Sequence, residues 1–231
     1  MSGLARREVV PERLDALTPT DPDAIASRRD LRRLHRAMGH SPIAAELIRR
    51  HADGGILRMA DIGCGDGVAI LRVLRRLGPP PDGARLTLLD MAPAVTDRTK
   101  TALQDIGWQI EIVALDVFEW CKAKEDGFDV TIANLFLHHF PAAPLQDLLE
   151  TLCGKTRLLV ATEPLRAPLA HLASRVLGVL GANAVTRHDA PVSVRAGFRD
   201  AELSALWPGE ALFEGRRGPF VHAFAGRGTA P

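Results

Sequence analysis

The stretch Arg58-Met59-Ala60-Asp61-Ile62-Gly63-Cys64-Gly65-Asp66-Gly67-Val68 decides the fold that we predict for this chain. Its first half is mostly apolar, as expected of a strand buried in a parallel sheet. Glycine then occupies alternate positions, at Gly63, Gly65 and Gly67, and allows a sharp turn that a ligand can approach without meeting a Cβ. Apolar residues recur at helical spacing from Val68 to Leu77. The stretch predicts a strand, a turn and a helix, with ligand binding at the carboxyl end of the strand.

The spacing of the glycines indicates which nucleotide the turn would bind. A dinucleotide-binding turn has the pattern G-x-G-x-x-G, and here the third glycine would fall on Val68. The observed pattern, D-x-G-x-G-x-G, resembles motif I of class I S-adenosylmethionine-dependent methyltransferases. A tight strand-to-helix turn without any ligand is the alternative interpretation.

Composition bounds the class of protein. The chain has 231 residues, which suits one α/β domain with a short extension, and 46% hydrophobic residues suffice for a core. The formal net charge of +1 argues against a nucleic-acid binder. Cys64, Cys121 and Cys153 lack metal-ligand spacing, so we expect reduced thiols and no bound metal. Residues 1–20 have no apolar core of a signal peptide, and no apolar run reaches membrane-helix length, so we expect a cytoplasmic protein without stable membrane insertion.

Two helices are predicted before the first strand. Residues 1–20 are expected to be a loose lead-in, and a helix capped by Asp21 would run from Pro22 to about Met38. A second helix would begin at Ser41-Pro42. We interpret residues 1–52 as a helical cap and residues 53–231 as the cofactor-binding domain. The first helix carries clustered arginines, which would either cover an anionic or phenolate acceptor or form a solvated basic face: Arg28, Arg29, Arg32, Arg33 and Arg36.

Carboxylates end the next two predicted strands. Residues 84–90 end at Asp90, which lies 23 positions after Gly67, and a carboxylate there accepts hydrogen bonds from ribose hydroxyls in nucleotide-binding α/β folds. An ordinary helix cap is the alternative. Residues 109–115 form the third strand, followed by Asp116 and Val117.

Residues 128–140 contain the fourth strand and resemble motif IV of small-molecule methyltransferases. They lack the N-P-P-Y type of sequence that is associated with amino-methylation of nucleic-acid bases. Asn134 would lie where the strand leaves the sheet, and His138 and His139 follow it. A histidine near the sulfonium can accept a phenol proton because its ordinary pKa is close to neutral. Packing or loop support is the alternative role for each of them.

The rest of the chain is expected to complete the sheet. Helices are predicted at residues 144–152 and 200–206. A strand is predicted at residues 156–162, and Glu163 follows it at the ligand-binding edge of the sheet. Strands at residues 210–215 and 220–225 are expected to form a hairpin. Residues 167–180 are amphipathic, and we expect their apolar face to pack in the core. An apolar wall for a lipid-like substrate is the alternative.

Residues 185–198 are polar and charged although they lie between apolar elements. They resemble the T-R-H-D-A-P-x-S-V-R segment of bacterial methyltransferases associated with type III polyketide synthases, and residues 31–39 fit the same group. Asp189 would orient His188, as a carboxylate orients a catalytic imidazole. A local hydrogen-bonded turn is the alternative.

The resemblance implies roles for particular residues. The glycines would shape the pocket, and Asp61 would hold the methionyl amino group. Asp90 and the adjacent Met91 would contact the ribose region. Asp116 and Val117 would contact the adenine, and Asn134 would lie beside the methionyl part of the cofactor. His138, His139 and His188 are the base candidates. We therefore predict a doubly wound α/β fold, a seven-stranded Rossmann-like methyltransferase sheet with an antiparallel last strand and an N-terminal helical cap.

The predicted function is S-adenosylmethionine-dependent methylation of a small molecule. The expected acceptor is a phenolic or polyketide-like oxygen of secondary metabolism, with S-adenosylmethionine as cofactor and a homodimer left open. The alternatives are a nicotinamide-dependent oxidoreductase, which Val68 disfavours, and a non-catalytic cofactor-binding scaffold.

Overall fold

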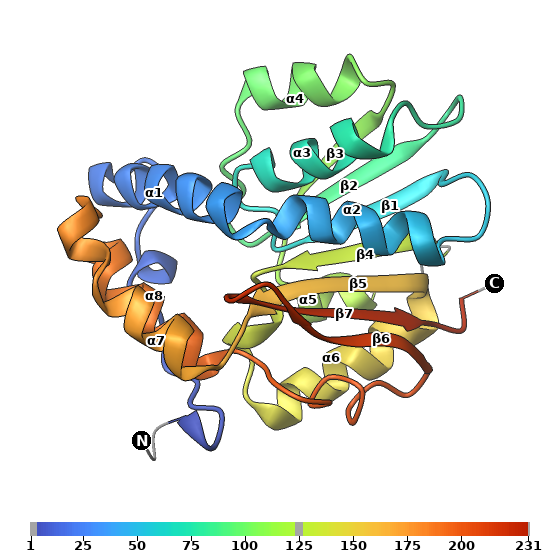
Figure 1. The fold of residues 1–231 in the computed structure, drawn as a ribbon. Helices are drawn as coiled ribbons and strands as arrows, with labels where there is room; N and C mark the ends of the chain where they lie inside the picture. Colours follow the sequence, from blue (N-terminus) through green and yellow to red (C-terminus); the bar gives the residue numbers. More distant parts are fainter. Residues whose placement is uncertain (1–3, 123–126, 231) are drawn as a thin grey trace.

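One seven-stranded sheet forms the centre of the computed structural model, which describes residues 4–122 and 127–230. The strand order is β3-β2-β1-β4-β5-β7-β6, and β7 runs antiparallel to both β5 and β6 (Figure 1). The strands are β1 (Arg58–Ile62), β2 (Arg85–Asp90), β3 (Gln109–Ala114), β4 (Phe128–Asn134), β5 (Thr156–Pro164), β6 (Glu210–Arg217) and β7 (Val221–Arg227). The predicted sheet and its antiparallel last strand are thereby confirmed.

The register of the parallel strands brings their carboxyl ends to one edge. Ile62 at the end of β1 pairs with Leu89 of β2 on one side and with Ala133 of β4 on the other. Gly63, which follows β1, and Asp90, the last residue of β2, therefore lie side by side at this edge. This is the edge at which open α/β sheets bind ligands.

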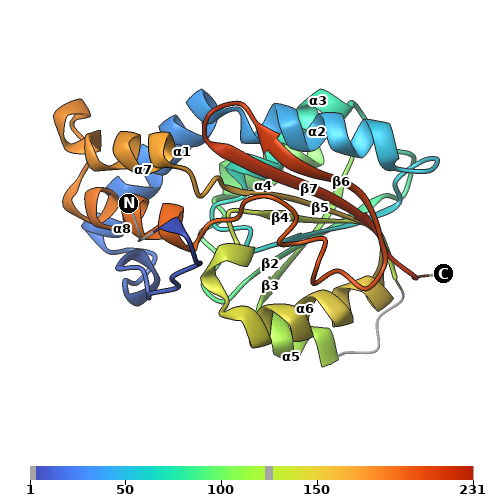
Figure 2. The same ribbon diagram turned by 60° about the horizontal axis from the view of Figure 1, so that its bottom comes forward.

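Helices cover both faces of the sheet (Figure 2). They are α1 (Pro22–Met38), α2 (His40–His51), α3 (Val68–Leu77), α4 (Asp97–Gln104), α5 (Val117–Lys122), α6 (Ala142–Lys155), α7 (Pro168–Arg175) and α8 (Ala184–Ala196), with 3₁₀ turns η2 (Leu14–Ala16), η3 (Leu137–His139) and η4 (Leu177–Leu180). None of the helices within residues 4–122 and 127–230 is long and apolar enough to cross a membrane.

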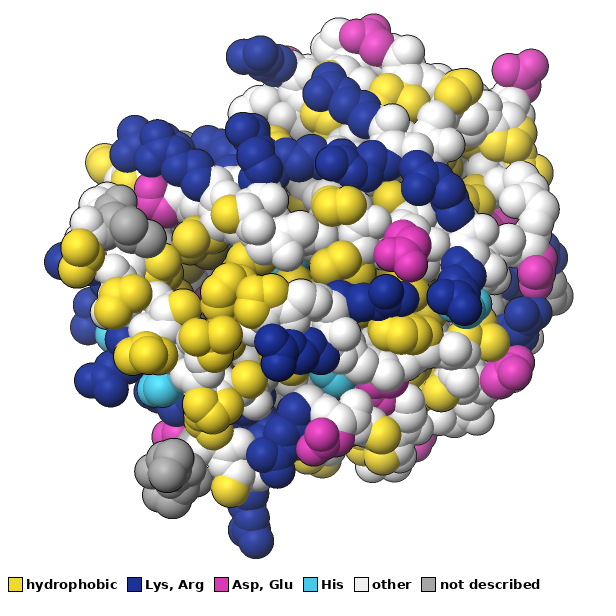
Figure 3. All heavy atoms as spheres, viewed as in Figure 1, with side chains coloured by type: hydrophobic (Ala, Val, Ile, Leu, Met, Phe, Trp, Pro, Cys, Tyr) yellow, Lys and Arg dark blue, Asp and Glu magenta, His cyan; other side chains and the backbone are white. Residues whose placement is uncertain are grey.

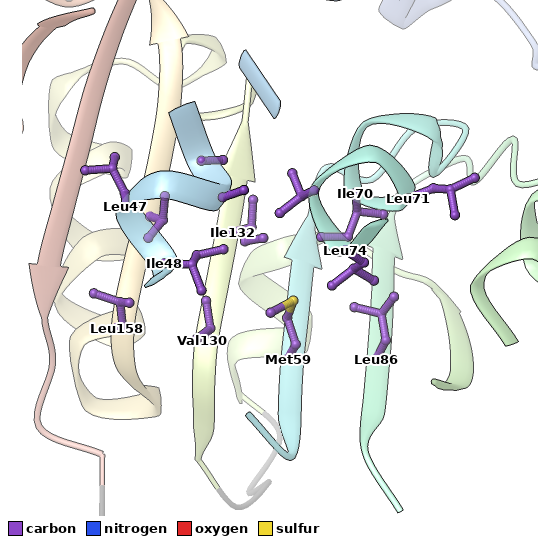
Figure 4. Close-up of a cluster of buried hydrophobic side chains, with 14 of the residues drawn as sticks. Leu47, Ile48, Met59, Ile70, Leu71, Leu74, Leu86, Val130, Ile132 and Leu158 are labelled. Atoms are coloured by element: carbon purple, nitrogen blue, oxygen red, sulfur yellow. The ribbon is translucent and has the colours of Figure 1, made fainter. Parts of the chain in front are cut away.

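The core has two halves, one on each face of the sheet. On the first face, Leu47 of α2 and Leu74 of α3 are buried against side chains of β1, β2 and β4 such as Met59 and Val130 (Figure 4). Each such side chain contributes roughly 1.5–3 kcal/mol to folding. Side chains of α5 and α6 fill the second face. The second helix of the predicted cap is thus part of the core layer of the sheet, whereas α1 extends past it to α8 (Figure 1).

Three local predictions are corrected by the structure. Residues 184–196, which we had not interpreted as regular structure, form helix α8 with Pro191 inside it. Residues 200–206 form turns rather than a helix. Residues 167–180 divide into α7 and η4 at Val176, whose φ and ψ of −97° and 3° end the helix. The apolar face of α7 is exposed and not core, because the helix buries its small residues Ala170 and Ser174 instead.

The exposed face of α7 leads to a prediction about stability. Leu172 is 62% exposed, while Leu148 of α6 is fully buried. We expect Leu172→Ala to change the free energy of unfolding by less than about 0.5 kcal/mol, and Leu148→Ala to lower it by about 2–5 kcal/mol. Chemical denaturation of both variants measures the difference, and equal losses would mean that α7 packs in the core after all.

Candidate active site

The glycine turn after β1 has a backbone that requires glycine. Gly63, Gly65 and Gly67 all have positive φ, at 72°, 54° and 70°. The amides of Gly63 and Cys64 both donate to the carbonyl of Leu89, at 2.8 and 3.0 Å, and so hold the turn against β2. A Cβ at Gly63 would lie 2.6 Å from Cγ of Phe136. The chain therefore passes tightly under Phe136 before α3 begins at Val68.

Asp90 ties the end of β2 to the same turn. Its Oδ2 accepts the amide of Gly65 at 2.9 Å, and its Oδ1 accepts the amide of Ala92 at 2.9 Å. Met91, the next residue, is 74% exposed. The carboxylate thus lies beside the turn, at the position predicted for the ribose anchor.

Asp61 of β1 is a buried carboxylate. It is only 3% exposed, and within the described residues no hydrogen bond or ion pair to its side chain is found. Burial, together with the negative charges of Asp90 and Asp66, raises the pKa of Asp61 to about 8. A cation bound beside Asp61 would favour its charged form and lower its pKa again.

The polar side chains at the ends of β3 and β4 form hydrogen bonds with neighbouring residues. Oδ1 of Asp116 accepts the amides of Phe118 at 2.8 Å and Glu119 at 3.3 Å and caps α5, whose first residue, Val117, is buried. Oδ1 of Asn134 accepts the hydroxyl of Thr162 at 2.8 Å. These contacts orient both side chains at the carboxyl edge of the sheet.

His138 lies buried between two carboxylates. Its Nδ1 is 2.7 Å from Oε2 of Glu163, and its Nε2 is 3.4 Å from Oε1 of Glu12. The other oxygen of Glu163 accepts the amides of Phe136 and Leu137. Burial lowers the pKa of His138, but the hydrogen bonds and charges of Glu12 and Glu163 outweigh it and raise the pKa to about 9. With only protein contacts, this imidazole is charged at neutral pH.

The other two histidines are more accessible. The side chain of His139 is 27% exposed, with Nδ1 3.3 Å from Oδ2 of Asp15, and its ring centroid is 4.3 Å from that of His138. On α8, Nδ1 of His188 is 2.8 Å from Oδ1 of Asp189, and the role of His188 as a base stays a prediction. Across the described residues, no hydrogen bond, ion pair or ring contact joins His188 to His138 or His139, although α8 packs against η3.

The N-terminal segment is the part of the site that our sequence analysis missed. We expected residues 1–20 to be a loose lead-in, but residues 4–16 pack against α8 and η3. Arg7 donates to the carbonyls of Ala196 and Phe140 at 2.9 and 3.1 Å. The amides of Arg13 and Leu14 donate to Asp189 at 2.9 and 3.0 Å. The carboxylates at positions 12 and 15 were visible in the sequence, but no periodicity assigned them a partner.

The arginines of α1 divide between two roles. Nη1 of Arg32 is 2.8 Å from Oδ2 of Asp66, inside the glycine turn, so α1 contacts the candidate site directly. Arg33 is largely exposed, and Figure 3 shows Lys and Arg side chains in a row along α1 and α2. One arginine thus supports the predicted cap, and another belongs to a solvated basic face.

This fold, with a glycine turn and carboxylates at one edge, is that of the Rossmann-like methyltransferases. Residues 59–157 match the family described as "Methyltransferase domain". The structure resembles the plantazolicin methyltransferase BpumL, solved with S-adenosylhomocysteine, with a TM-score of 0.61 and 14% identity over 91% of this chain and 92% of that one. It also resembles the mitomycin 7-O-methyltransferase MmcR, with a TM-score of 0.55 and 25% identity over 93% of this chain and 60% of that one.

Two curated proteins are similar to part of the chain. The ubiquinone biosynthesis O-methyltransferase of Nitrosococcus oceani is 32% identical over 102 residues, 44% of this chain and 40% of that protein. The trans-aconitate 2-methyltransferase of Escherichia coli is 32% identical over 108 residues, 47% of this chain and 39% of that protein. The match therefore spans about two fifths of the length of these relatives. Location in the cell, a homodimer and the division at residue 52 stay predictions.

Proposed function

We propose that the chain binds S-adenosylmethionine at the carboxyl edge of β1 and β2 and transfers its methyl group to a small molecule. The observation that carries the proposal is Asp61, a buried carboxylate beside the glycine turn that has no partner within the described residues. The methionyl ammonium of S-adenosylmethionine would supply the missing cation. The similarity to proteins solved with S-adenosylmethionine or S-adenosylhomocysteine supports the same cofactor.

The remaining cofactor contacts follow from the strand ends. Asp90, held by Gly65, would accept the ribose hydroxyls, with Met91 covering that region. Asp116 uses Oδ1 to cap α5, which leaves Oδ2 for the adenine amino group, and the backbone of Val117 would contact the ring. Asn134, oriented by Thr162, would lie beside the methionyl part. No contact described above favours a nicotinamide cofactor, and Val68 occupies the place of the third glycine.

The proposed acceptor is a phenolic or polyketide-like oxygen. When bound, S-adenosylmethionine would supply a methyl group activated by its sulfonium. The acceptor oxygen would form the new C–O bond with a lone pair, and the electrons of the broken C–S bond would stay on sulfur as a neutral thioether. Positioning and exclusion of water supply much of the catalysis, because the methyl group is already activated by the sulfonium. Similarity to two O-methyltransferases, those of mitomycin and ubiquinone biosynthesis, supports oxygen as the atom methylated.

A base is needed where the acceptor oxygen keeps its proton. Of the three candidates, His138 is the least suited, because it is buried and its raised pKa of about 9 keeps it protonated. His139 and His188 keep partly exposed rings, and each has a carboxylate on Nδ1 that would leave Nε2 to receive the proton.

Calorimetric titration with S-adenosylhomocysteine, beside NAD and NADP, tests the proposal. We expect S-adenosylhomocysteine alone to bind, and Asp90→Asn to weaken it about tenfold or more, because a hydrogen bond to a charged group contributes about 1.5–3 kcal/mol. The variant keeps one oxygen acceptor for the amide of Gly65. Asp105→Asn, at the C-terminal end of α4, is the matched control and should bind like wild type. Binding of a nicotinamide cofactor, or of none of the three ligands, would overturn the proposal.

A further inference from the structure

Glu12, His138 and His139 form a cluster that the proposed methyl transfer does not explain. One ligand atom from each residue lies within 4.8 Å of the others, and within the described part of the chain no other group of histidine, cysteine or carboxylate side chains meets in this way. The side chains of Glu12 and His138 are 11% and 4% exposed, and that of His139 is 27% exposed. The cluster is therefore largely buried, with one accessible member through which an ion can enter.

Nδ1 of each histidine in the cluster lies close to a carboxylate. Nδ1 of His138 is 2.7 Å from Glu163, and Nδ1 of His139 is 3.3 Å from Asp15. Histidines that bind metals almost always donate their other ring N–H to a carboxylate, a carbonyl or water, which sets the tautomer and aims the free nitrogen at the ion. Nε2 of His138, which lies 3.4 Å from Glu12, would be a ligand atom once an ion displaces its proton. His139 contributes a ring nitrogen within 4.8 Å of the other two ligand atoms.

The distance between Glu12 and His138 is long for a charged hydrogen bond and also suits two ligands of one ion. Nε2 of His138 and Oε1 of Glu12 are 3.4 Å apart, whereas charged N–H···O bonds are about 2.7–2.9 Å long. Two ligands at about 2.0–2.1 Å from a tetrahedral zinc ion are separated by about 3.4 Å. The ligand atoms of the cluster lie within 4.8 Å of one another, so the largest separation exceeds the ligand-to-ligand distance at zinc by at most about 1.4 Å. A rotation of the partly exposed His139 side chain can close this difference.

We propose that Glu12, His138 and His139 form a binding site for a divalent transition-metal ion, and that zinc is the ion that this ligand set fits best. Two imidazoles and one carboxylate are a frequent ligand set for zinc, with a fourth position left to water. The ion would join the N-terminal segment to η3. It would also occupy His138 and His139, which leaves His188 as the remaining base candidate. The sequence alone does not indicate this site, because its cysteines lack metal-ligand spacing and Glu12 lies 126 positions from His138.

The test is a zinc titration of the full chain after treatment with a chelator, without cofactor or acceptor, so that it does not depend on the proposed function. We expect one zinc ion per chain and an increase in melting temperature, because an ion that binds only the folded state stabilises it. His139→Ala should weaken zinc binding at least a hundredfold. Asp15→Asn should weaken it about 10- to 100-fold, as loss of a carboxylate behind a ligating histidine does.

The variants are chosen so that folding does not decide the outcome. His139 and Asp15 are accessible side chains, and the unfolding transition of each variant in the absence of zinc reports whether it folds. His51→Ala, at the end of α2, removes a histidine outside the cluster and should leave zinc affinity unchanged. The near-ultraviolet absorption of the Co²⁺-loaded protein should lack a thiolate charge-transfer band. Equal zinc affinity in wild type and His139→Ala, or a thiolate band, would overturn the site.

Discussion

Asp61→Asn is expected to stabilise the cofactor-free protein while it weakens cofactor binding. Wild type carries a buried carboxylate whose pKa is raised from an ordinary value of 3.8 to about 8 by burial and by Asp90 and Asp66. Between these two pH values the unfolded chain has released the proton of Asp61, while the folded chain still holds it. The unfolded state thus binds fewer protons, so the contribution of Asp61 to stability falls as pH rises through this window.

The amide that replaces the carboxylate in this variant has no such titration. We therefore expect the excess stability of Asp61→Asn over wild type to grow from about pH 4 to about pH 8 and to stay constant above. The affinity for S-adenosylhomocysteine should fall about 10- to 100-fold, because a charged hydrogen bond to the methionyl ammonium is lost. Thermal unfolding across this pH range and calorimetry at neutral pH measure the two effects.

Asp105→Asn serves as the control for Asp61→Asn, since Asp105 is exposed at the end of α4. It should change neither the pH profile nor the affinity. A variant of Asp61 that binds S-adenosylhomocysteine like wild type would show that the methionyl group is held elsewhere. A loss of stability at every pH would show that Asp61 already has a partner in the folded protein.

Gly63→Ala and Gly65→Ala are expected to fail in different ways, although both residues have positive φ. At Gly63, the new Cβ would overlap the ring of Phe136. The strain of a left-handed backbone, roughly 1–2 kcal/mol, and overpacking, roughly 1–3 kcal/mol, should together lower the free energy of unfolding by about 2–5 kcal/mol. At Gly65 no atom lies within 4 Å of the new Cβ, so only the backbone strain remains.

The open space beside Gly65 is where we place the cofactor. Gly65→Ala should therefore fold with a loss of only about 1–2 kcal/mol but bind S-adenosylhomocysteine at least tenfold more weakly. Chemical denaturation and calorimetry on both variants separate the two effects. Gly83→Ala is the control for backbone strain alone, because Gly83 has a φ of +83° and open space around its Cβ, before β2. Unchanged affinity in Gly65→Ala would mean that the cofactor does not approach this glycine.

Much of the fold was predictable because it depends on local patterns. The apolar run before Gly63 and the helical spacing after Val68 predicted β1, the turn and α3. The apolar strands ending at Asp90 and Asn134 were predicted in the same way, and their observed bounds agree at the carboxyl ends. The apolar face of α7 was misassigned because periodicity does not say which face of a helix meets a neighbour.

The sequence by itself determined the edge of the candidate site. Parallel strands end at a common edge of the sheet. Residues at or just after these ends, such as Gly63 and Asp90, therefore lie close together however the side chains elsewhere pack. Only the tertiary structure decided what surrounds His138. Glu12 and Glu163 reach it from the N-terminal segment and from β5, and Asp189 holds the amide of Arg13 across 176 positions. Such contacts follow from the packing of the whole chain, because no local periodicity relates residues so far apart.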